Sequence, residues 1–341
     1  MAAAAEPEPT PPLDPIVEGR VRSVLARRYP DAAVGDLAPL AGGHSGHTLV
    51  AELVGDAPAR VVVKAGTPGR APVKRDDVLR QTRVIDAVHG WPGVAVPEVL
   101  ASSDGDPQVA VMTMEAGEAH EPVLDGLGDR SPDRITARAT AVARQLGALH
   151  AIDVRTTALA DVEPLTIADE LARWTATIRA VDQDLVVGSE DLIARLVASC
   201  PADGTPAIVH GDYRLGNILC DGDAPTAIID WEIWSITDPR IDLGWTLLFC
   251  DTDEFPGVGH PAPGMLDVDA FLAAYAEVAG PVDDVGWFLA FGRLKMAAIM
   301  GHNLKRHRSG RYHDPYQEQL PPTIASMVVR GLEAVDQVAA R

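Results

Sequence analysis

Three polar side chains stand at a fixed spacing around a short turn in the second half of the 341-residue chain. Asp212 is followed five residues later by Asn217, and a turn-rich stretch at 221–225 then leads to Asp230. Apolar runs on both sides of the turn predict a β-hairpin with these side chains at its ends. A carboxylate can accept the proton of a nearby hydroxyl, and carboxylate and amide oxygens suit Mg²⁺. Phosphoryl transfer to a hydroxyl needs both of these functions.

The spacing Asp-x-x-x-x-Asn, with an acidic residue after the hairpin, is typical of a kinase catalytic loop. That pattern assigns Asp212 as the base and Asn217 and Asp230 as the Mg²⁺ ligands. Arg214, two residues after the base, is a candidate either for stabilising the transferred phosphate or for a structural salt bridge. Asp and Asn are also common turn residues, so an ordinary hairpin is the alternative for any one of them. The whole set of residues favours the catalytic interpretation.

The chain resembles the aminoglycoside phosphotransferase/choline kinase family at three segments, 210–219, 228–232 and 238–245. They read His-Gly-Asp-Tyr-Arg-Leu-Gly-Asn-Ile-Leu, Ile-Ile-Asp-Trp-Glu and Asp-Pro-Arg-Ile-Asp-Leu-Gly-Trp. A weaker resemblance covers roughly residues 20 to 310, and its nearest form is the kinase-like domain of some acyl-CoA dehydrogenase fusions. The resemblance implies an α+β, two-lobed protein-kinase-like fold. An N-terminal antiparallel sheet with a helix would precede a larger, mainly helical C-terminal lobe.

The same resemblance implies the cofactors and the type of reaction. The γ-phosphate of ATP would move, with Mg²⁺, to a hydroxyl of a small molecule, and GTP is not excluded as donor. An aminoglycoside or another antibiotic is a candidate acceptor, in which case the protein would confer antibiotic resistance. The acceptor-binding acidic residues cannot be selected from the sequence, because many carboxylates occur in the second half of the chain.

The upstream sequence contains a candidate phosphate-binding region. Residues 38–65 predict three strands, and backbone N–H groups of a glycine-rich turn between the first two would approach phosphates. That turn holds Gly42, Gly43, Ser45 and Gly46. Lys64 ends an apolar strand at the position of the kinase β3 lysine. In the helix predicted over 76–88, Gln81 stands where the acidic partner of that lysine is expected, so a hydrogen bond would replace the ion pair.

Strands predicted over 94–100 and 108–115 lead to a hinge at Met114 and Glu115, where backbone groups would receive adenine. Methionines at this position are equally compatible with a plain core. We therefore expect a disordered tail over 1–14, a nucleotide-binding lobe with its hinge over 15–117, and a catalytic and acceptor-binding lobe over 118–341. Apolar periodicity predicts helices in the second lobe at 134–149, 167–181, 190–199, 268–278, 284–305 and 323–340.

Two further residues of the second lobe have expected structural roles. Asp242 lies in the first turn of a helix predicted from about residue 241, where it would brace the backbone of the catalytic loop. His150 is expected to be a helix-end residue rather than a catalyst.

A formal net charge of −20 argues against nucleic acid as a partner, because binding it needs a basic surface. The charge would attract a cationic acceptor, although a merely well-solvated acidic surface is the simpler and favoured explanation. The sequence has no apolar run near 18 residues and no secretory leader pattern, and its three cysteines lack metal-binding spacing. We expect a cytoplasmic protein with reduced thiols, no membrane partner, and a monomeric or homodimeric state.

Two other functions compete with phosphoryl transfer to a small molecule. Protein-kinase activity is disfavoured because His-Gly-Asp replaces His-Arg-Asp, and because only a short stretch separates Asp230 from Asp238. The alternative from another functional class is a nucleotide-binding pseudokinase or sensor module without transferase activity. It is suggested by Gln81, which stands in place of the usual acidic partner of Lys64. The intact Asp212, Asn217 and Asp230 argue against that alternative.

Overall fold

The computed structural model describes residues 13–40, 47–73, 76–311 and 313–339. Its contacts divide the chain into two compact units, Met1–His89 with Pro97–Glu115, and Gly90–Val96 with Ala116–Arg341. The segment Gly90–Val96 had been expected in the first lobe. In the structure it groups with the second unit, and the N–H of Ile228 donates to the carbonyl of Ala95 at 2.8 Å.

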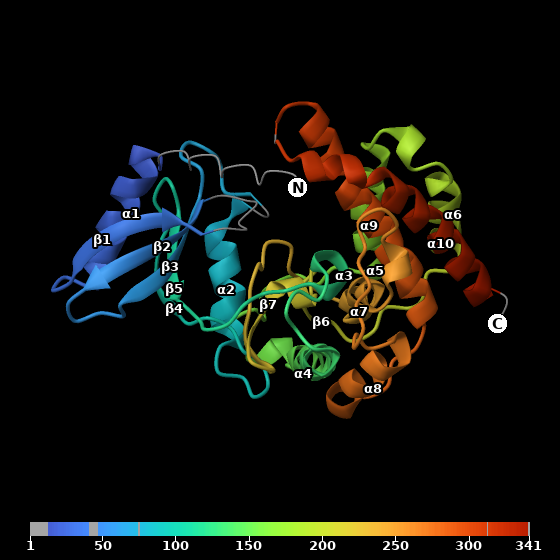
Figure 1. Cartoon of the computed structure of the whole chain (residues 1–341), viewed down its shortest axis with the longest axis horizontal. Coiled ribbons are helices and arrows are strands. Elements are labelled where there is room, and N and C mark those ends of the chain that lie inside the picture. Colours follow the sequence, from blue (N-terminus) through green and yellow to red (C-terminus); the bar gives the residue numbers. More distant parts are fainter. Residues whose placement is uncertain (1–12, 41–46, 74–75, 312, 340–341) are drawn as a thin grey trace. The chain divides into compact units, whose positions relative to one another are not determined.

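The first unit is a five-stranded antiparallel sheet in the order β1-β2-β3-β5-β4, flanked by two helices (Figure 1). The strands are β1 (Ala33–Pro39), β2 (His47–Val54), β3 (Arg60–Ala65), β4 (Val99–Ser103) and β5 (Val109–Thr113). The helices are α1 (Pro15–Arg28) and α2 (Val78–Val88). Asp14 accepts a hydrogen bond from Ile16 N–H at 2.8 Å and so caps α1. Residues 1–12 of the predicted tail lie outside the described residues.

Strand alternation builds the core of this unit. Leu49, Ala51 and Leu53 of β2 are buried on one face together with the inward residues of α1, such as Val21. Two strand boundaries differ from the sequence prediction. β1 begins at residue 33 rather than near 38, and β4 begins at Val99 rather than at 94. Pro97 has no N–H to donate to a ladder, which explains why the strand starts after it.

The second unit is mainly helical. Its helices are α3 (Pro122–Asp125), α4 (Pro132–His150), α5 (Ile167–Arg179), α6 (Ser189–Ala198), α7 (Arg240–Thr246), α8 (Val268–Ala279), α9 (Val285–Arg308) and α10 (Pro321–Ala339). Its strands form two short antiparallel pairs, β6 (Ala207–Val209) with β9 (Ser235–Thr237), and β7 (Ile218–Asp221) with β8 (Ala224–Ile228). Within the described ranges, no helix combines the length and apolar character that crossing a bilayer requires.

Helix α9 is central to the core of the second unit, and it contacts α5, α6, α7 and α10. The crossing of α7 and α9 brings their backbones together at two glycines. A side-chain carbon added at Gly244 would lie 2.1 Å from the carbonyl oxygen of Phe288, and one added at Gly292 would lie 2.1 Å from that of Gly244. Because any larger residue would force the helices apart, these glycines set the distance between α7 and α9.

Candidate active site

The candidate active site begins where β6 ends. All three residues of β6 are buried, and the strand pairs with β9. Gly211 follows with a φ of +87°, a left-handed conformation that glycine adopts without steric cost. A side-chain carbon added there would lie 2.6 Å from the carbonyl oxygen of Ile233, so the close approach also requires glycine. The chain thus turns sharply just before Asp212.

Asp242, in the first turn of α7, holds the backbone of this turn. Its carboxylate accepts hydrogen bonds from the N–H groups of His210 and Gly211, each at 2.7 Å. Nε2 of His150, at the end of α4, lies 3.3 Å from the same carboxylate, and Nδ1 of His150 lies 2.9 Å from the Tyr275 hydroxyl. Burial would raise the pKa of Asp242, but the hydrogen bond and charge of His150 hold it below its usual value. The expectation that Asp242 braces the loop is confirmed.

Two donors fix the carboxylate of Asp212. Nε1 of Trp245 donates to Oδ1 at 2.8 Å, and Nδ2 of Asn217 donates to Oδ2 at 2.9 Å. A quarter of the Asp212 side chain remains exposed (25%). Because both donors hold the carboxylate in one orientation, it can receive a proton from a hydroxyl that approaches its exposed part.

The β7–β8 hairpin brings Asn217 and Asp230 to one end. Ile218 pairs with Ile228, and the N–H of Ile229 donates to the backbone carbonyl of Asn217 at 2.9 Å. Asp230 is therefore the residue directly after Ile229, whose N–H bonds to Asn217. Its φ of +66° is uncommon for a residue other than glycine, and such conformations concentrate at functional sites.

Asn217 and Asp230 have the donor chemistry of a magnesium site. Nδ2 of Asn217 donates both to the carboxylate of Asp212 and to its backbone carbonyl, the latter at 2.8 Å. The amide oxygen of Asn217 is therefore the atom that can face a cation, and Asp230 adds carboxylate oxygens. Oxygen donors of this kind fit Mg²⁺, which in nucleotide sites takes few protein ligands besides the phosphates.

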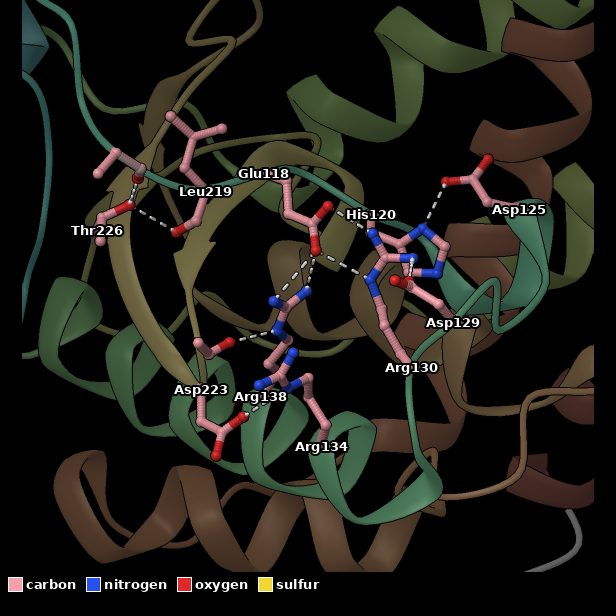
Figure 2. Close-up of polar contacts among 12 residues, drawn as sticks. Glu118, His120, Asp125, Asp129, Arg130, Arg134, Arg138, Leu219, Asp223 and Thr226 are labelled. Atoms are coloured by element: carbon pink, nitrogen blue, oxygen red, sulfur yellow. Dashed lines mark hydrogen bonds and ion pairs between the residues drawn. The ribbon is translucent and has the colours of Figure 1, made fainter.

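A network of arginines secures the far end of the hairpin. The backbones of Glu118 and Cys220 exchange two hydrogen bonds, at 3.1 and 3.0 Å, so the segment before α3 joins the edge of β7. Figure 2 shows the Glu118 carboxylate between Arg130, at 2.6 Å, and Arg138, at 3.3 Å. The bond from Arg130 lowers the pKa of Glu118, and Arg138 also donates to the carbonyl of Gly222 at 2.8 Å. The turn of the hairpin is thereby tied to α4.

Arg214 lies between two carboxylates of the loop region. Its Nε is 3.4 Å from Oδ1 of Asp212, and one of its terminal nitrogens is 3.7 Å from Oε2 of Glu121. Its guanidinium carbon lies 5.6 Å from the centre of the Phe249 ring. Of the two roles that the sequence left open for Arg214, the salt bridge is present in this structure. Contact with a transferred phosphate stays a prediction.

Glu121 is a residue of this region that the sequence did not single out. Its side chain is buried, and Oε2 accepts a hydrogen bond from Gly216 N–H at 3.1 Å. Oε1 is buried as well and has no hydrogen-bond partner within the part of the chain that the structure describes. Burial raises the pKa of Glu121 to about 7, against the opposing effects of Arg214 and the Gly216 N–H. No local sequence pattern marks this residue, because its carboxylate bonds to a loop far along the chain, at Arg214 and Gly216.

The residues predicted to hold the nucleotide lie in the first unit. Lys64 is in β3, and Gln81 is buried on α2. Met114 and Glu115 follow β5, and the Met114 side chain is exposed. The predicted glycine-rich turn lies outside the described residues, and it includes Gly42, Gly43, Ser45 and Gly46.

Comparisons with known proteins agree with this architecture. The model of a family described as the phosphotransferase enzyme family (APH) matches residues 36–287. A crystal structure of a provisional aminoglycoside phosphotransferase from Ralstonia eutropha aligns with a TM-score of 0.76 at 22% identity, covering 94% of this chain and 98% of that one. Macrolide 2′-phosphotransferase type I aligns with a TM-score of 0.61 at 19% identity, covering 92% and 98%.

A ternary complex of aminoglycoside phosphotransferase APH(4)-Ia with AMP-PNP and hygromycin B also aligns, with a TM-score of 0.58 at 17% identity, covering 90% of this chain and 98% of that one. At such low sequence identities, these structural alignments show the fold alone. They confirm the predicted two-lobed, kinase-like fold.

Curated relatives are longer proteins. The mouse acyl-CoA dehydrogenase family member 10 is 26% identical over 268 residues, which are 73% of this chain and 25% of that protein. The acyl-CoA dehydrogenase family member 11 of Pongo abelii is 23% identical over 183 residues, which are 50% of this chain and 23% of that protein. The chain thus spans about a quarter of the length of these relatives.

Proposed function

The chain belongs to the phosphotransferase enzyme family, and from that premise we propose that this small-molecule kinase transfers the γ-phosphate of ATP, with Mg²⁺, to a hydroxyl of its acceptor. One observation supports the proposal above all others. Asp212 presents a partly exposed carboxylate whose orientation is fixed by Trp245 and Asn217. A general base must be held within hydrogen-bond reach of the hydroxyl, and such positioning contributes much of the rate of a phosphoryl transfer.

In this proposal Asn217 and Asp230 are the protein ligands of Mg²⁺, and Arg214 contacts the transferred phosphate. The metal, when bound, neutralises charge on the phosphate oxygens. Lys64 and the turn of Gly42, Gly43, Ser45 and Gly46 hold the phosphates, Gln81 supports Lys64, and the backbone at Met114 and Glu115 receives the base. The nucleotide complexes among the similar structures support nucleotide use.

The acceptor is proposed only as a class, a small molecule with a free hydroxyl. Aminoglycosides are candidates because similar structures carry that name, and the net charge of −20 supports a cationic acceptor. Hydroxyacyl compounds are candidates because the curated relatives are named as acyl-CoA dehydrogenases. The three free cysteines support a reducing compartment such as the cytoplasm.

The test is a coupled assay of ADP or GDP release over aminoglycosides, macrolides, sugars, amino alcohols and hydroxyacyl compounds. Asp212→Asn is the matched control, because it keeps the size of the side chain and removes the base. We expect turnover of the true acceptor to fall by roughly a hundredfold or more, while ATP affinity stays within a few-fold.

Equal turnover by the two proteins would remove Asp212 as the base. Nucleotide binding without turnover of any acceptor would instead favour the sensor module.

A further inference from the structure

Lys295, in the middle of α9, is a buried lysine beside the catalytic loop. Its side chain is 2% exposed, and its ammonium group donates a hydrogen bond to the backbone carbonyl of Gly211. Burial lowers the pKa of Lys295, while the negative charges of Glu170, Asp242 and Asp212 act in the opposite direction. A buried ammonium group is costly, and an apolar side chain of similar size would fill the same space at lower cost. A charged residue at this buried position therefore needs an explanation other than packing.

Two indole rings surround the charge of Lys295. Its Nζ lies 4.6 Å from the centre of the Trp245 ring and 5.2 Å from that of Trp174, within the range of cation–π attraction. Nε1 of Trp174 donates in turn to Glu170 at 3.0 Å, and Glu170 is itself buried. The rings and the buried carboxylate together form a setting that favours the charged form of the lysine.

The close crossing of α7 and α9 explains how Lys295 reaches this place. Gly292 lies against Gly244, and Trp245 is the next residue of α7. Lys295 lies three residues after Gly292, and residues three apart share a face of a helix. The close contact of α7 and α9 thus places the ammonium group of Lys295 over the ring of Trp245, the residue that donates to Asp212.

We propose that Lys295 is a positioning residue for Asp212. It acts by two routes, through the Gly211 carbonyl that precedes the carboxylate and through the Trp245 indole that holds it. The carboxylate of Asp242 accepts hydrogen bonds from the N–H groups of the same turn. The turn is therefore bonded on its N–H side to buried Asp242 and on its carbonyl side to buried Lys295. Lys295 lies beyond residue 287, where the match to the family model ends. The catalytic consequence of this role rests on the proposed function, but the structural consequence does not.

The first test measures turnover and nucleotide affinity in Lys295→Met, since methionine keeps much of the volume and removes the charge and the donor. A base displaced by about 1 Å loses roughly a hundredfold in rate, so we expect kcat to fall by about that factor while ATP affinity changes less than about threefold. Lys305→Met is the control. Lys305 lies on the same helix and donates to a backbone carbonyl, that of Ala180, but its side chain is exposed.

The second test needs no enzymatic activity. The chain has six tryptophans, so the ¹⁵N-indole spectrum is simple, and Trp245→Phe identifies one of the six signals. In the wild-type background Asp212→Asn should shift the Trp245 signal, because it alters the acceptor of the indole N–H. In the Lys295→Met background that shift should largely vanish, and in the Lys305→Met background it should persist.

Each outcome decides the proposal. An unchanged coupling between Asp212 and Trp245 in Lys295→Met would overturn it, and so would unchanged kcat in an active protein. If the wild type turns over no acceptor, the proposed function fails while the indole coupling still decides the role of Lys295. Should Lys295→Met fail to fold, Lys295→Leu is assessed by the same criteria, since it too removes both the charge and the donor.

Discussion

The carboxylate of Glu121 lies where an ionised group is costly. Burial raises its pKa to about 7, whereas the same group in an unfolded chain titrates near its ordinary value of 4.5. Between these two values the folded state binds more protons than the unfolded state. The contribution of Glu121 to stability is therefore fully present below about pH 4.5 and is lost as the pH rises through about 7. The loss is on the order of 3 kcal/mol.

Replacing Glu121 by glutamine should remove this loss, because the amide stays neutral and still offers an oxygen to Gly216 N–H. We expect Glu121→Gln to be more stable than the wild type at pH 8 and similar to it at pH 4.5, as measured by urea unfolding. Glu118→Gln is the control with the opposite sign, since the bond from Arg130 lowers the pKa of Glu118. A pH-independent difference for Glu121→Gln would contradict the assignment.

At the same scale, the sequence is informative where chemistry demands a fixed spacing. The placement of Asp212, Asn217 and Asp230 on one hairpin and its loop can be predicted from it, because the lengths of the loop and the hairpin fix that placement. Glu121 and Lys295 cannot. Each reaches the loop through tertiary packing, and neither has a neighbour in the sequence that marks it.

At the scale of elements, α4 and α5 lie within two residues of their predicted ranges, because a long amphipathic helix repeats its signal over several turns. The three-residue strands β6 and β9 carry too little alternation for such a prediction. The crossing of α7 and α9 was also not predictable. A glycine inside a helix indicates a cost in stability, but not which other helix it contacts.

Gly292→Ala tests that crossing. Alanine favours a helix by roughly 1 kcal/mol over glycine, yet the added carbon would lie 2.1 Å from the carbonyl oxygen of Gly244. We expect a net destabilisation of about 1 to 3 kcal/mol in urea unfolding, together with lower turnover as Trp245 and Lys295 shift. Gly19→Ala in α1 is the control, because nothing lies within 4 Å of the added carbon. An unchanged free energy of unfolding in Gly292→Ala would mean that α7 and α9 can separate without cost.

At the scale of the whole molecule, ligand binding and folding are linked. Magnesium and ATP at about 100 times the dissociation constant should stabilise the folded protein by roughly 2.7 kcal/mol, observable as a rise in Tm. Asp230→Asn should remove most of the magnesium-dependent part of that rise. Asparagine is chosen because it tolerates the left-handed backbone of residue 230, whereas alanine would add strain.

The matched control is Asp284→Asn, which changes the other described aspartate with a positive φ, at +59°. Its magnesium-dependent rise in Tm should equal that of the wild type. A full rise in Asp230→Asn would exclude Asp230 as a metal ligand.

The contact between Lys295 and Gly211 joins residues 84 positions apart in the chain. A ribosome that has just completed the catalytic motif must therefore still synthesise about the first half of α9, up to Lys295, before the loop acquires this contact. A nascent chain, or a gene interrupted ahead of α9, retains Asp212, Asn217 and Asp230 but not this support. Genome surveys that recognise only the motif of Asp212, Asn217 and Asp230 would count such truncated copies as kinases. The presence of α9 in the sequence distinguishes intact copies from truncated ones.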